Sequence, residues 1–287
     1  MAEPKTTEYV VPQSVGEAVE ALSESPKARV IAGGTDLMVG MREGHVHPTR
    51  LVDITRIQEL IGISTQNGSL RIGAATKIDE ILHHPTVRSE YPALVDAGQL
   101  LGGWQIQNMA TLAGNLCNAS PAAEMSGPLL VLDAEVEVMG PSGERRIPLG
   151  EFWTGPGKTV LEPAEILTTI VIPGKVSGRL SAYQRVDIRH SVDIALVSSA
   201  VGVELSEGKV QLARIALGAV APTVIRVTEA EAYLQGRTLS EEVLDKVEDL
   251  AEAAAVPITD VRASAEYRSA MAGVLARRVL LLAAERG

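Results

Sequence analysis

Gly33, Gly34, Thr35 and Asp36 are the first residues of the chain whose types and spacing suggest chemistry. They follow an apolar run, ARVIA at 28–32, which is typical of a buried strand. Glycine at a strand-to-helix turn lets the backbone approach a phosphate and point its N–H groups inward, and the next helix adds its positive end. The segment therefore predicts a cradle for a pyrophosphate. Thr35 would donate a further hydrogen bond, and Asp36 would cap the helix or turn outward.

An ordinary tight turn would need the same glycines. This short glycine motif is therefore weak evidence when it stands alone. A second stretch, NMATLAGNLCNASPAAE at 108–124, is small and polar, lacks a helix or strand pattern, and has apolar flanks. A buried irregular loop must satisfy its own backbone groups, which a large polar ligand would do. The alternative is a glycine- and alanine-rich turn packed against its neighbours. Residues with suitable partners for such a ligand are Thr111, Gly114, Asn115, Asn118, Ser120 and Glu124.

Three other features suggest a nucleotide site, a metal site or a nucleophile, but each lacks the neighbouring residues that such a site requires. GPGKT at 155–159 resembles part of a nucleotide P-loop, but the required earlier glycine is Phe152 and no strand leads into it. The histidines at 45/47 and 83/84 lie in polar turns, without carboxylate or cysteine partners in the sequence, and are predicted to be surface residues. Cys117 has no local base and is predicted to be a packing residue. We therefore expect no catalytic residue and no metal ligand.

Composition excludes several classes of protein. The chain has 287 residues and a net charge of −10, from 36 acidic and 26 basic residues, which argues against binding to nucleic acid or a membrane surface. A single cysteine excludes an internal disulfide framework and an all-cysteine iron–sulfur or zinc site, and it fits a reducing compartment. The N-terminus lacks an apolar signal region, and the run at 279–284 is too short for a membrane span. The sequence predicts a cytoplasmic α+β protein.

Periodicity and turn residues predict the elements that would position the two loops. A serine or threonine followed three residues later by an acidic residue predicts helix starts at Ser14, Thr76 and Thr238. Two strands at 28–32 and 50–54, with a short helix between them, predict a compact βαβ-like unit. The remaining expected elements are a hairpin at 135–149, a strand at 165–173, a boundary at 174–178, a meander of three antiparallel strands, and two closing helices, the last at about 264–285.

The two loops together resemble those of a known family. VIAGGTDLM and ATLAGNLCNASPAAE, with the ending EYRSAMAGVLARRVL, look like the FAD-binding medium subunit of the molybdenum hydroxylases, which include xanthine dehydrogenase and carbon monoxide dehydrogenase. The resemblance covers nearly the whole chain. It implies an α+β fold, with a two-lobed FAD-binding α/β module (PCMH-type) followed by a C-terminal antiparallel sheet-plus-helices domain. The expected domains are a small N-terminal FAD-binding lobe at 1–57, a central FAD-binding lobe at 58–175, and the C-terminal domain at 176–287.

The resemblance also implies that FAD lies between the first two lobes, and it implies which residues hold the cofactor there. Leu101 and Leu161 fall near the cofactor rings, and Ile194 falls where a residue approaches the isoalloxazine. The chain departs from the family at Ala113, where many members have glycine, and at Gln107, where arginine is common. The first loop would hold the pyrophosphate through Val30, Ile31, Ala32, Gly33, Gly34, Thr35, Asp36 and Leu37. The second would hold it and the ribityl chain through Thr111, Gly114, Asn115, Asn118 and Glu124, with Ser120 as a further polar partner.

The implied role is an electron relay. A large subunit with the molybdenum cofactor and a small 2Fe-2S subunit would be partners, in a dimer of heterotrimers, and FAD would deliver electrons to an external acceptor. Molybdenum and iron–sulfur clusters would belong to those partners rather than to this chain. Two alternatives remain open. One is an autonomous FAD-dependent oxidoreductase, which would need its own substrate pocket and general base; the other is a non-catalytic nucleotide-binding assembly subunit.

Overall fold

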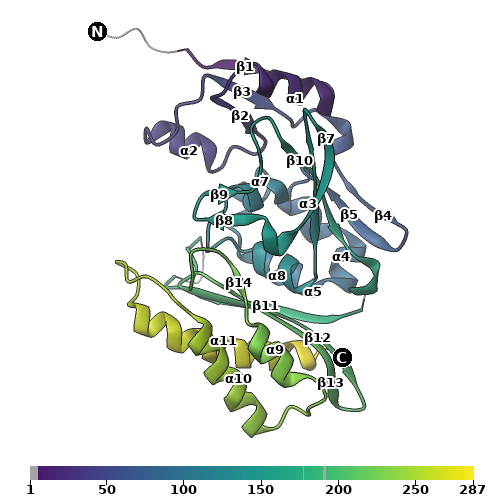
Figure 1. Ribbon diagram of the computed structural model, residues 1–287, viewed down its shortest axis with the longest axis vertical. Helices are drawn as coiled ribbons and strands as arrows, with labels where there is room; N and C mark the ends of the chain where they lie inside the picture. The colour runs from purple at the N-terminus through teal and green to yellow at the C-terminus, as the bar shows by residue number, and fades with distance from the viewer. Residues whose placement is uncertain (1–5, 177, 190–191) are drawn as a thin grey trace.

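The computed structural model describes residues 6–176, 178–189 and 192–287, and arranges them in tiers along its long axis (Figure 1). The first tier is a parallel sheet in the order β1–β3–β2, with α1 and α2 beside it. The predicted βαβ unit is confirmed as β2–α2–β3. The strand predicted to be buried is only partly so, since Ala28 alone in β2 is buried. The elements are β1 (Glu8–Val10), α1 (Val15–Ser23), β2 (Ala28–Ile31), α2 (Leu37–Arg42) and β3 (Arg50–Asp53).

The central tier is an antiparallel sheet in the order β4–β5–β10–β6–β7, packed with short helices. The predicted hairpin at 135–149 is confirmed as β6 and β7. The elements are η1 (Gln58–Leu60), β4 (Ile63–Gln66), β5 (Ser69–Gly73), α3 (Ile78–His83), α4 (Pro85–Glu90), α5 (Pro92–Leu100), α6 (Trp104–Gln107), α7 (Leu112–Cys117), α8 (Ser126–Val131), β6 (Glu135–Gly140), β7 (Gly143–Pro148), η2 (Leu149–Glu151), β8 (Trp153–Gly155), β9 (Lys158–Thr159), β10 (Ile166–Ile172) and η3 (Gly174–Val176).

The C-terminal tier confirms the predicted antiparallel meander followed by helices. Its sheet, in the order β11–β12–β13–β14, lies between the central tier and the helices α9, α10 and α11 (Figure 1). The whole arrangement confirms the predicted α+β class. The elements are β11 (Leu180–Val186), β12 (Val197–Ser206), β13 (Lys209–Gly218), β14 (Ile225–Arg226), α9 (Thr228–Leu234), α10 (Glu241–Ala254) and α11 (Ala265–Ala284).

Two apolar clusters divide the interior unevenly. One is shared by the first and central tiers, from α1 through β10, and also takes in Tyr183, Ala200 and Ala216 from the upper face of the C-terminal sheet. The other lies between the opposite face of that sheet and helices α9–α11. The first two tiers therefore fold around common apolar contacts, whereas the C-terminal tier has an apolar core of its own.

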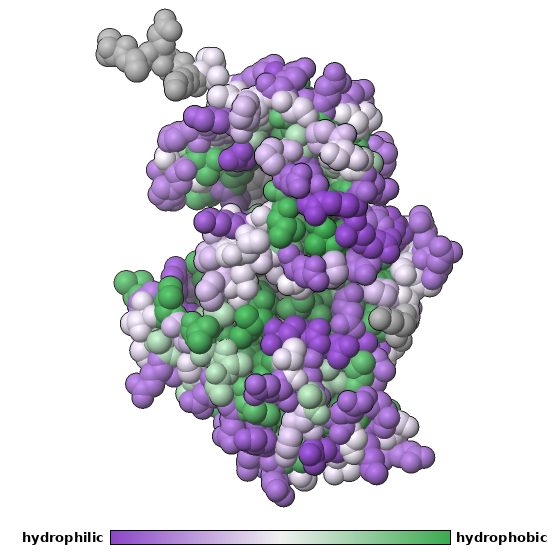
Figure 2. Space-filling view, in the orientation of Figure 1, coloured by the Kyte–Doolittle hydropathy of each residue, from purple (hydrophilic) through white to green (hydrophobic). Residues whose placement is uncertain are grey.

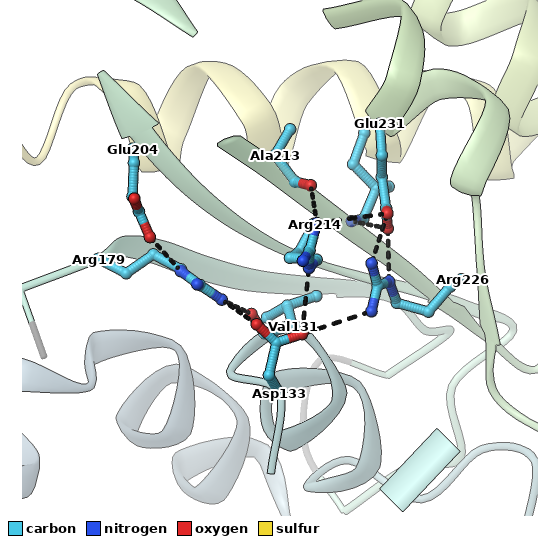
Figure 3. Close-up of polar contacts among 9 residues, drawn as sticks. Val131, Asp133, Arg179, Glu204, Ala213, Arg214, Arg226 and Glu231 are labelled. Carbon is cyan, nitrogen blue, oxygen red and sulfur yellow. Dashed lines mark hydrogen bonds and ion pairs between the residues drawn. The ribbon is translucent and has the colours of Figure 1, made fainter. Parts of the chain in front are cut away.

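A network of ion pairs joins the central tier to the C-terminal sheet (Figure 3). The carboxylate of Asp133, just after α8, accepts from Arg179 (2.9 Å) and Arg214 (3.1 Å), and Arg226 lies 3.6 Å away. Arg179, whose side chain is 2% exposed, also donates to the carbonyl of Val131 (2.9 Å). Burial opposes ionisation of Asp133, but the hydrogen bonds from these arginines hold its pKa below the usual range. Around Asp133 this joint is polar and charged, and the carboxylate has three arginine neighbours.

The predicted helix starts are confirmed at one of three positions. The Ser14 hydroxyl accepts from the N–H of Glu17 (3.2 Å) and caps α1. The Thr76 hydroxyl instead pairs with the backbone of Gly62, at 2.9 and 3.1 Å, so α3 begins without it. The cap of α10 is Ser240 and not Thr238. The Thr76 prediction fails because a local spacing rule does not see the tertiary partner that takes its hydroxyl, whereas at α10 a serine two residues further along provides the cap.

The predicted boundaries at 57/58 and 175/176 stay predictions. Residues 1–5 of the first predicted domain, and residue 177 within the predicted boundary segment, lie outside the described residues. Within the described part of the chain, no helix is both long enough and apolar enough to cross a membrane.

Candidate functional site

The first glycine loop touches the second predicted segment directly. A Cβ at Gly33 would lie 2.0 Å from the carbonyl oxygen of Met109 and 2.9 Å from the Cα of Ala110. Gly34 has a φ of +67°, a conformation that glycine adopts without strain. The backbone of the second segment thus fills the space that a side chain at Gly33 would need. That the two glycines let the backbone close on a pyrophosphate stays a prediction. The close contact brings together two loops that lie far apart in the sequence.

Backbone donors in the first loop remain available. Within the described chain, the N–H groups of Gly33, Gly34 and Thr35 donate to no protein acceptor, while the Gly34 carbonyl accepts from Met38 (3.0 Å). Asp36 stands at the start of α2, where its exposed side chain makes no capping hydrogen bond. Free N–H groups beside a left-handed glycine suit an anionic oxygen. Figure 2 shows the surface hollowed between the first and central tiers, on the side where α2 lies.

The second segment is not the irregular loop that its composition predicts. Leu112–Cys117 forms α7, which begins at Thr111, whose hydroxyl accepts from the N–H of Gly114 (3.1 Å). Leu112 and Leu116, four residues apart, form its buried face. The glycine and asparagine in so short a helix have low helix propensity, so tertiary packing stabilises a turn that the sequence alone does not indicate. The Thr111 hydroxyl keeps its own proton free for another acceptor.

The other face of α7 offers polar groups. Gly114 and Asn118 are exposed, and the Oδ1 atom of Asn115 is buried without a hydrogen-bond partner among the described residues. Ser120 accepts from the N–H of Ala122 (3.2 Å). An orphaned buried amide oxygen calls for a donor from outside the chain. Together with the free N–H groups of the first loop, these residues fit a dinucleotide that carries both phosphates and hydroxyls.

The apolar residues predicted near the cofactor rings differ in exposure. Leu101 is buried, Leu161 is partly buried against the central core, and Ile194 is 50% exposed. Ile194 follows Asp193, whose carboxylate accepts from the N–H groups of Ile188 (3.0 Å) and Ile194 (2.9 Å). An ion pair with Arg189, and these backbone donors, hold the pKa of Asp193 far below its usual range. The loop that carries Ile194 is thus shaped by one carboxylate.

That loop packs against the segment beside Leu101. A Cβ at Gly103 would lie 3.5 Å from the Cγ2 atom of Val192, so the Ile194 loop and the start of α6 are neighbours. Leu101 lies just before this contact in the chain. The structure therefore brings Ile194 close to the stretch that carries Leu101, although they belong to different tiers. A hollow of about 510 Å³ between α5, β11 and α11 contains none of the predicted site residues.

Glu124 is the charged centre of the candidate site. Its side chain is 13% exposed, and the Nη1 atom of Arg185 lies 2.8 Å from its Oε1 atom. Burial raises the pKa of Glu124 to about 7; Arg185 lowers it, and the charge of Asp36 raises it. The two loops therefore place Asp36 and Glu124 within electrostatic reach of one another. Arg185 was missed by sequence reasoning, although the strand period places it on the same face as buried Tyr183.

The two residues that depart from the family pattern, Gln107 and Ala113, have side chains that contact the protein interior. Gln107 is 5% exposed, and its amide donates to the carbonyls of Gln99 (3.3 Å) and Leu101 (3.1 Å). Ala113 is buried on α7. Gln107 thus holds the turn after α5 rather than presenting a group to a ligand, and an alanine side chain at 113 packs into the core.

The remaining segments with suggestive residues have other roles. GPGKT forms the turn of the β8–β9 hairpin, where Gly157 donates to the carbonyl of Ala119 (3.0 Å), so the hairpin lies over the end of α7. Cys117 packs against the core, and burial raises the pKa of its thiol to about 12, which keeps it protonated. His45 and His83 are exposed, as predicted, but each lies near a carboxylate, Glu43 at 3.5 Å and Asp79 at 3.4 Å. The prediction that they lack carboxylate neighbours is wrong.

Family comparisons match both parts of the chain. Residues 5–175 match the FAD binding domain in molybdopterin dehydrogenase, and residues 181–283 match the CO dehydrogenase flavoprotein C-terminal domain. The putative xanthine dehydrogenase FAD-binding subunit of Escherichia coli K12 is 33% identical, over 93% of this chain and 92% of its own. The carbon monoxide dehydrogenase medium chain of Hydrogenophaga pseudoflava is 33% identical, over 96% of each.

Solved structures agree with the sequence comparisons. A chain of the Cu,Mo-CO dehydrogenase superposes with a TM-score of 0.95 at 34% identity, over 98% of both chains. A chain of quinoline 2-oxidoreductase from Pseudomonas putida 86 superposes with a TM-score of 0.93 at 30% identity, over 100% of this chain and 99% of that one. The likeness covers all tiers, including the C-terminal sheet and its helices.

Proposed function

The chain belongs to the family of FAD-binding medium subunits of molybdenum hydroxylases, and we propose that it is the flavoprotein subunit of such an oxidoreductase, which relays electrons from an iron–sulfur subunit to an external acceptor. The observation that carries the proposal is the contact between Gly33 and Met109, because it joins the two family loops into one polar cleft. The resemblance of the sequence to this family is confirmed by the matches over both parts of the chain.

Each part of the cleft has a distinct binding role in this proposal. The free N–H groups of Gly33, Gly34 and Thr35 bind the pyrophosphate, and Thr111 and Asn115 bind the hydroxyls of the linking chain. FAD supplies the chemistry, since it tolerates both one-electron and two-electron steps. The protein binds and orients it, and controls access to its ring.

The apolar residues would define the other end of the cleft. Leu101 and Leu161 shield the cofactor rings from water, and Ile194 contacts the isoalloxazine from the C-terminal tier. Ile194 is half exposed, which leaves one side open for an acceptor. Val30, Ile31, Ala32, Leu37, Gly114, Asn118, Ser120 and Glu124 complete the proposed set.

Partners and location belong to the same proposal. The matching carbon monoxide dehydrogenase medium chains are named as chains of a multisubunit enzyme. We infer that this chain assembles with a large molybdenum-cofactor subunit and a small 2Fe-2S subunit as a dimer of heterotrimers. Acidic composition and a single cysteine support a cytoplasmic location.

The experiment compares the purified chain with the co-purified complex. The chain should be yellow, with about one FAD per chain, and its flavin should be reduced only when the partner subunits and their substrate are present. Reduction of the isolated chain by a small substrate would instead support the autonomous oxidoreductase. A colourless preparation that takes up no FAD would leave only the assembly subunit.

A further inference from the structure

Arg185 links the C-terminal sheet to the candidate cleft. It lies in β11, and its side chain is 1% exposed. The Nη1 atom donates to Oε1 of Glu124 (2.8 Å) and to the carbonyl of Leu100 (3.0 Å), and the Nε atom donates to Oδ2 of Asp187 (2.8 Å). One buried guanidinium therefore contacts the residue before Leu101 and the carboxylate at the end of the second segment.

The arrangement is incomplete within the described chain. The Nη2 atom of Arg185 is buried and has no hydrogen-bond partner among the described residues, and neither has Oδ1 of Asn115. A buried guanidinium normally uses its donors, because leaving one unpaired costs free energy. Asn115 lies on α7 beside the proposed FAD cleft, and Arg185, which also lines the hollow between α5, β11 and α11, is joined to the cleft through Glu124. They indicate that this region has unfilled hydrogen-bonding capacity when the chain is alone.

We propose that Arg185 is a positioning residue for flavin binding: it holds the Glu124 carboxyl and the Leu100–Leu101 backbone in place, so that the C-terminal domain helps to set FAD affinity. This inference rests on the proposed function. Arg185 acts through Glu124, a residue of the proposed FAD-binding set, and through the chain that carries Leu101. The three-domain chain is then one binding unit, although the family loops lie in its first two tiers.

The charges around Glu124 make the proposal specific. Arg185 from β11 attracts the carboxylate, while Asp36 from the first loop repels it. Tyr183, also from β11, is buried near it and stays protonated, because burial raises its pKa above the usual range. Asp187 shares the Arg185 guanidinium. An ionised Glu124 would repel the negatively charged diphosphate of FAD, in addition to the repulsion from Asp36. FAD affinity should therefore fall as pH rises through about 7, the pKa of Glu124.

The test is a titration of flavin-free full-length chain with FAD across pH, for wild type, Arg185→Met, Glu124→Gln and the double variant. Arg185→Met should weaken binding about tenfold or more. It should also move the pH at which affinity falls upward, because the neighbour that lowers the pKa of Glu124 is gone. Glu124→Gln should abolish that pH dependence. In the Glu124→Gln background, Arg185→Met should have a much smaller effect, since its main partner is absent.

Arg214→Met is the matched control. Arg214 also extends from the C-terminal sheet to a carboxylate of the central tier, Asp133, but it has no contact with Glu124. It should lower stability and leave FAD affinity and its pH profile unchanged. Equal affinity and equal pH profile in wild type and Arg185→Met would overturn the proposal, as would an undiminished effect of Arg185→Met in the Glu124→Gln background. Failure of the wild-type chain to bind FAD at all would instead overturn the proposed function.

Discussion

The central tier meets its two neighbours in physically different ways. Towards the first tier, it shares apolar residues of α1, such as Val19 and Leu22, and the glycine loop touches Met109 through backbone alone. Towards the C-terminal tier, Asp133 gathers arginines from the opposing sheet (Figure 3), and a Cβ at Gly202 would lie 2.9 Å from the carbonyl of Val131. The first joint leaves polar backbone groups free, whereas the Asp133 network of the second joint pairs its charged groups. We infer that the first joint binds the ligand, that the Asp133 network of the second joint gives rigid support, and that Arg185, elsewhere in the second joint, positions Glu124.

The strongest test of the first joint is Gly33→Ala. A methyl group 2.0 Å from the Met109 carbonyl cannot be accommodated unless one backbone moves, so the two loops should separate. We expect the variant to lose bound FAD during gel filtration and to unfold at a lower temperature. Gly16→Ala, in α1 of the same tier, is the control, because its new methyl would meet only the Ser14 hydroxyl at 3.9 Å. Full flavin content in Gly33→Ala would show that the contact does not form the cleft.

The second joint is tested by Asp133→Ala. Removing this carboxylate leaves Arg179, 2% exposed, and its neighbours without their shared partner, which should cost about 3–5 kcal/mol of unfolding free energy. Urea denaturation measures the loss. Glu204→Gln removes a 41% exposed partner of the same arginine and should cost about 1 kcal/mol or less. If Asp133→Ala lost FAD affinity while remaining folded, the assignment of the Asp133 network to support alone would fail.

Stability against pH provides a third test, at Glu124. Its pKa is raised to about 7 in the folded chain, from about 4.5, so the folded state binds the extra proton. The contribution of Glu124 to the free energy of unfolding is fully present below about pH 4.5 and is lost as pH rises through about 7. The flavin-free wild type should therefore lose up to about 3 kcal/mol of unfolding free energy relative to Glu124→Gln across that window. Parallel pH curves for the two proteins would contradict the raised pKa.

The smallest effect is expected for Asp193→Asn. Its carboxylate accepts from Ile188, Arg189 and Ile194 in an exposed loop, so its loss should loosen that loop and little else. Hydrogen exchange should become faster at these amides, while the melting temperature changes only slightly. Because the pKa of Asp193 is lowered, the native loop should persist until strongly acidic pH. Unchanged amide protection would mean that packing, rather than the carboxylate, shapes the loop around Ile194.

Much of the fold follows from short windows of sequence. Strands β12 and β13 of the meander are long runs rich in small and apolar residues, and α1 carries both its cap and its stripe within ten residues. The candidate site is less predictable. Helix α7 was missed because its stabilising contacts are with neighbours elsewhere in the chain, and Thr76 was misassigned because its hydroxyl pairs with Gly62. Arg185 gave only the weak signal of an arginine on the same strand face as a buried tyrosine.

The order of the amino acids alone decided the types of element, the two glycine-bearing loops and the resemblance to the flavoprotein subunits. These depend on backbone preferences and on side-chain periods of two and 3.6 residues, which act over a few neighbours. The folded chain determines what Gly33 touches, which arginine contacts Glu124, and which arginines surround Asp133. Those answers depend on distances between residues far apart in the sequence, such as Glu124 and Arg185, and such distances exist only once the tiers have packed.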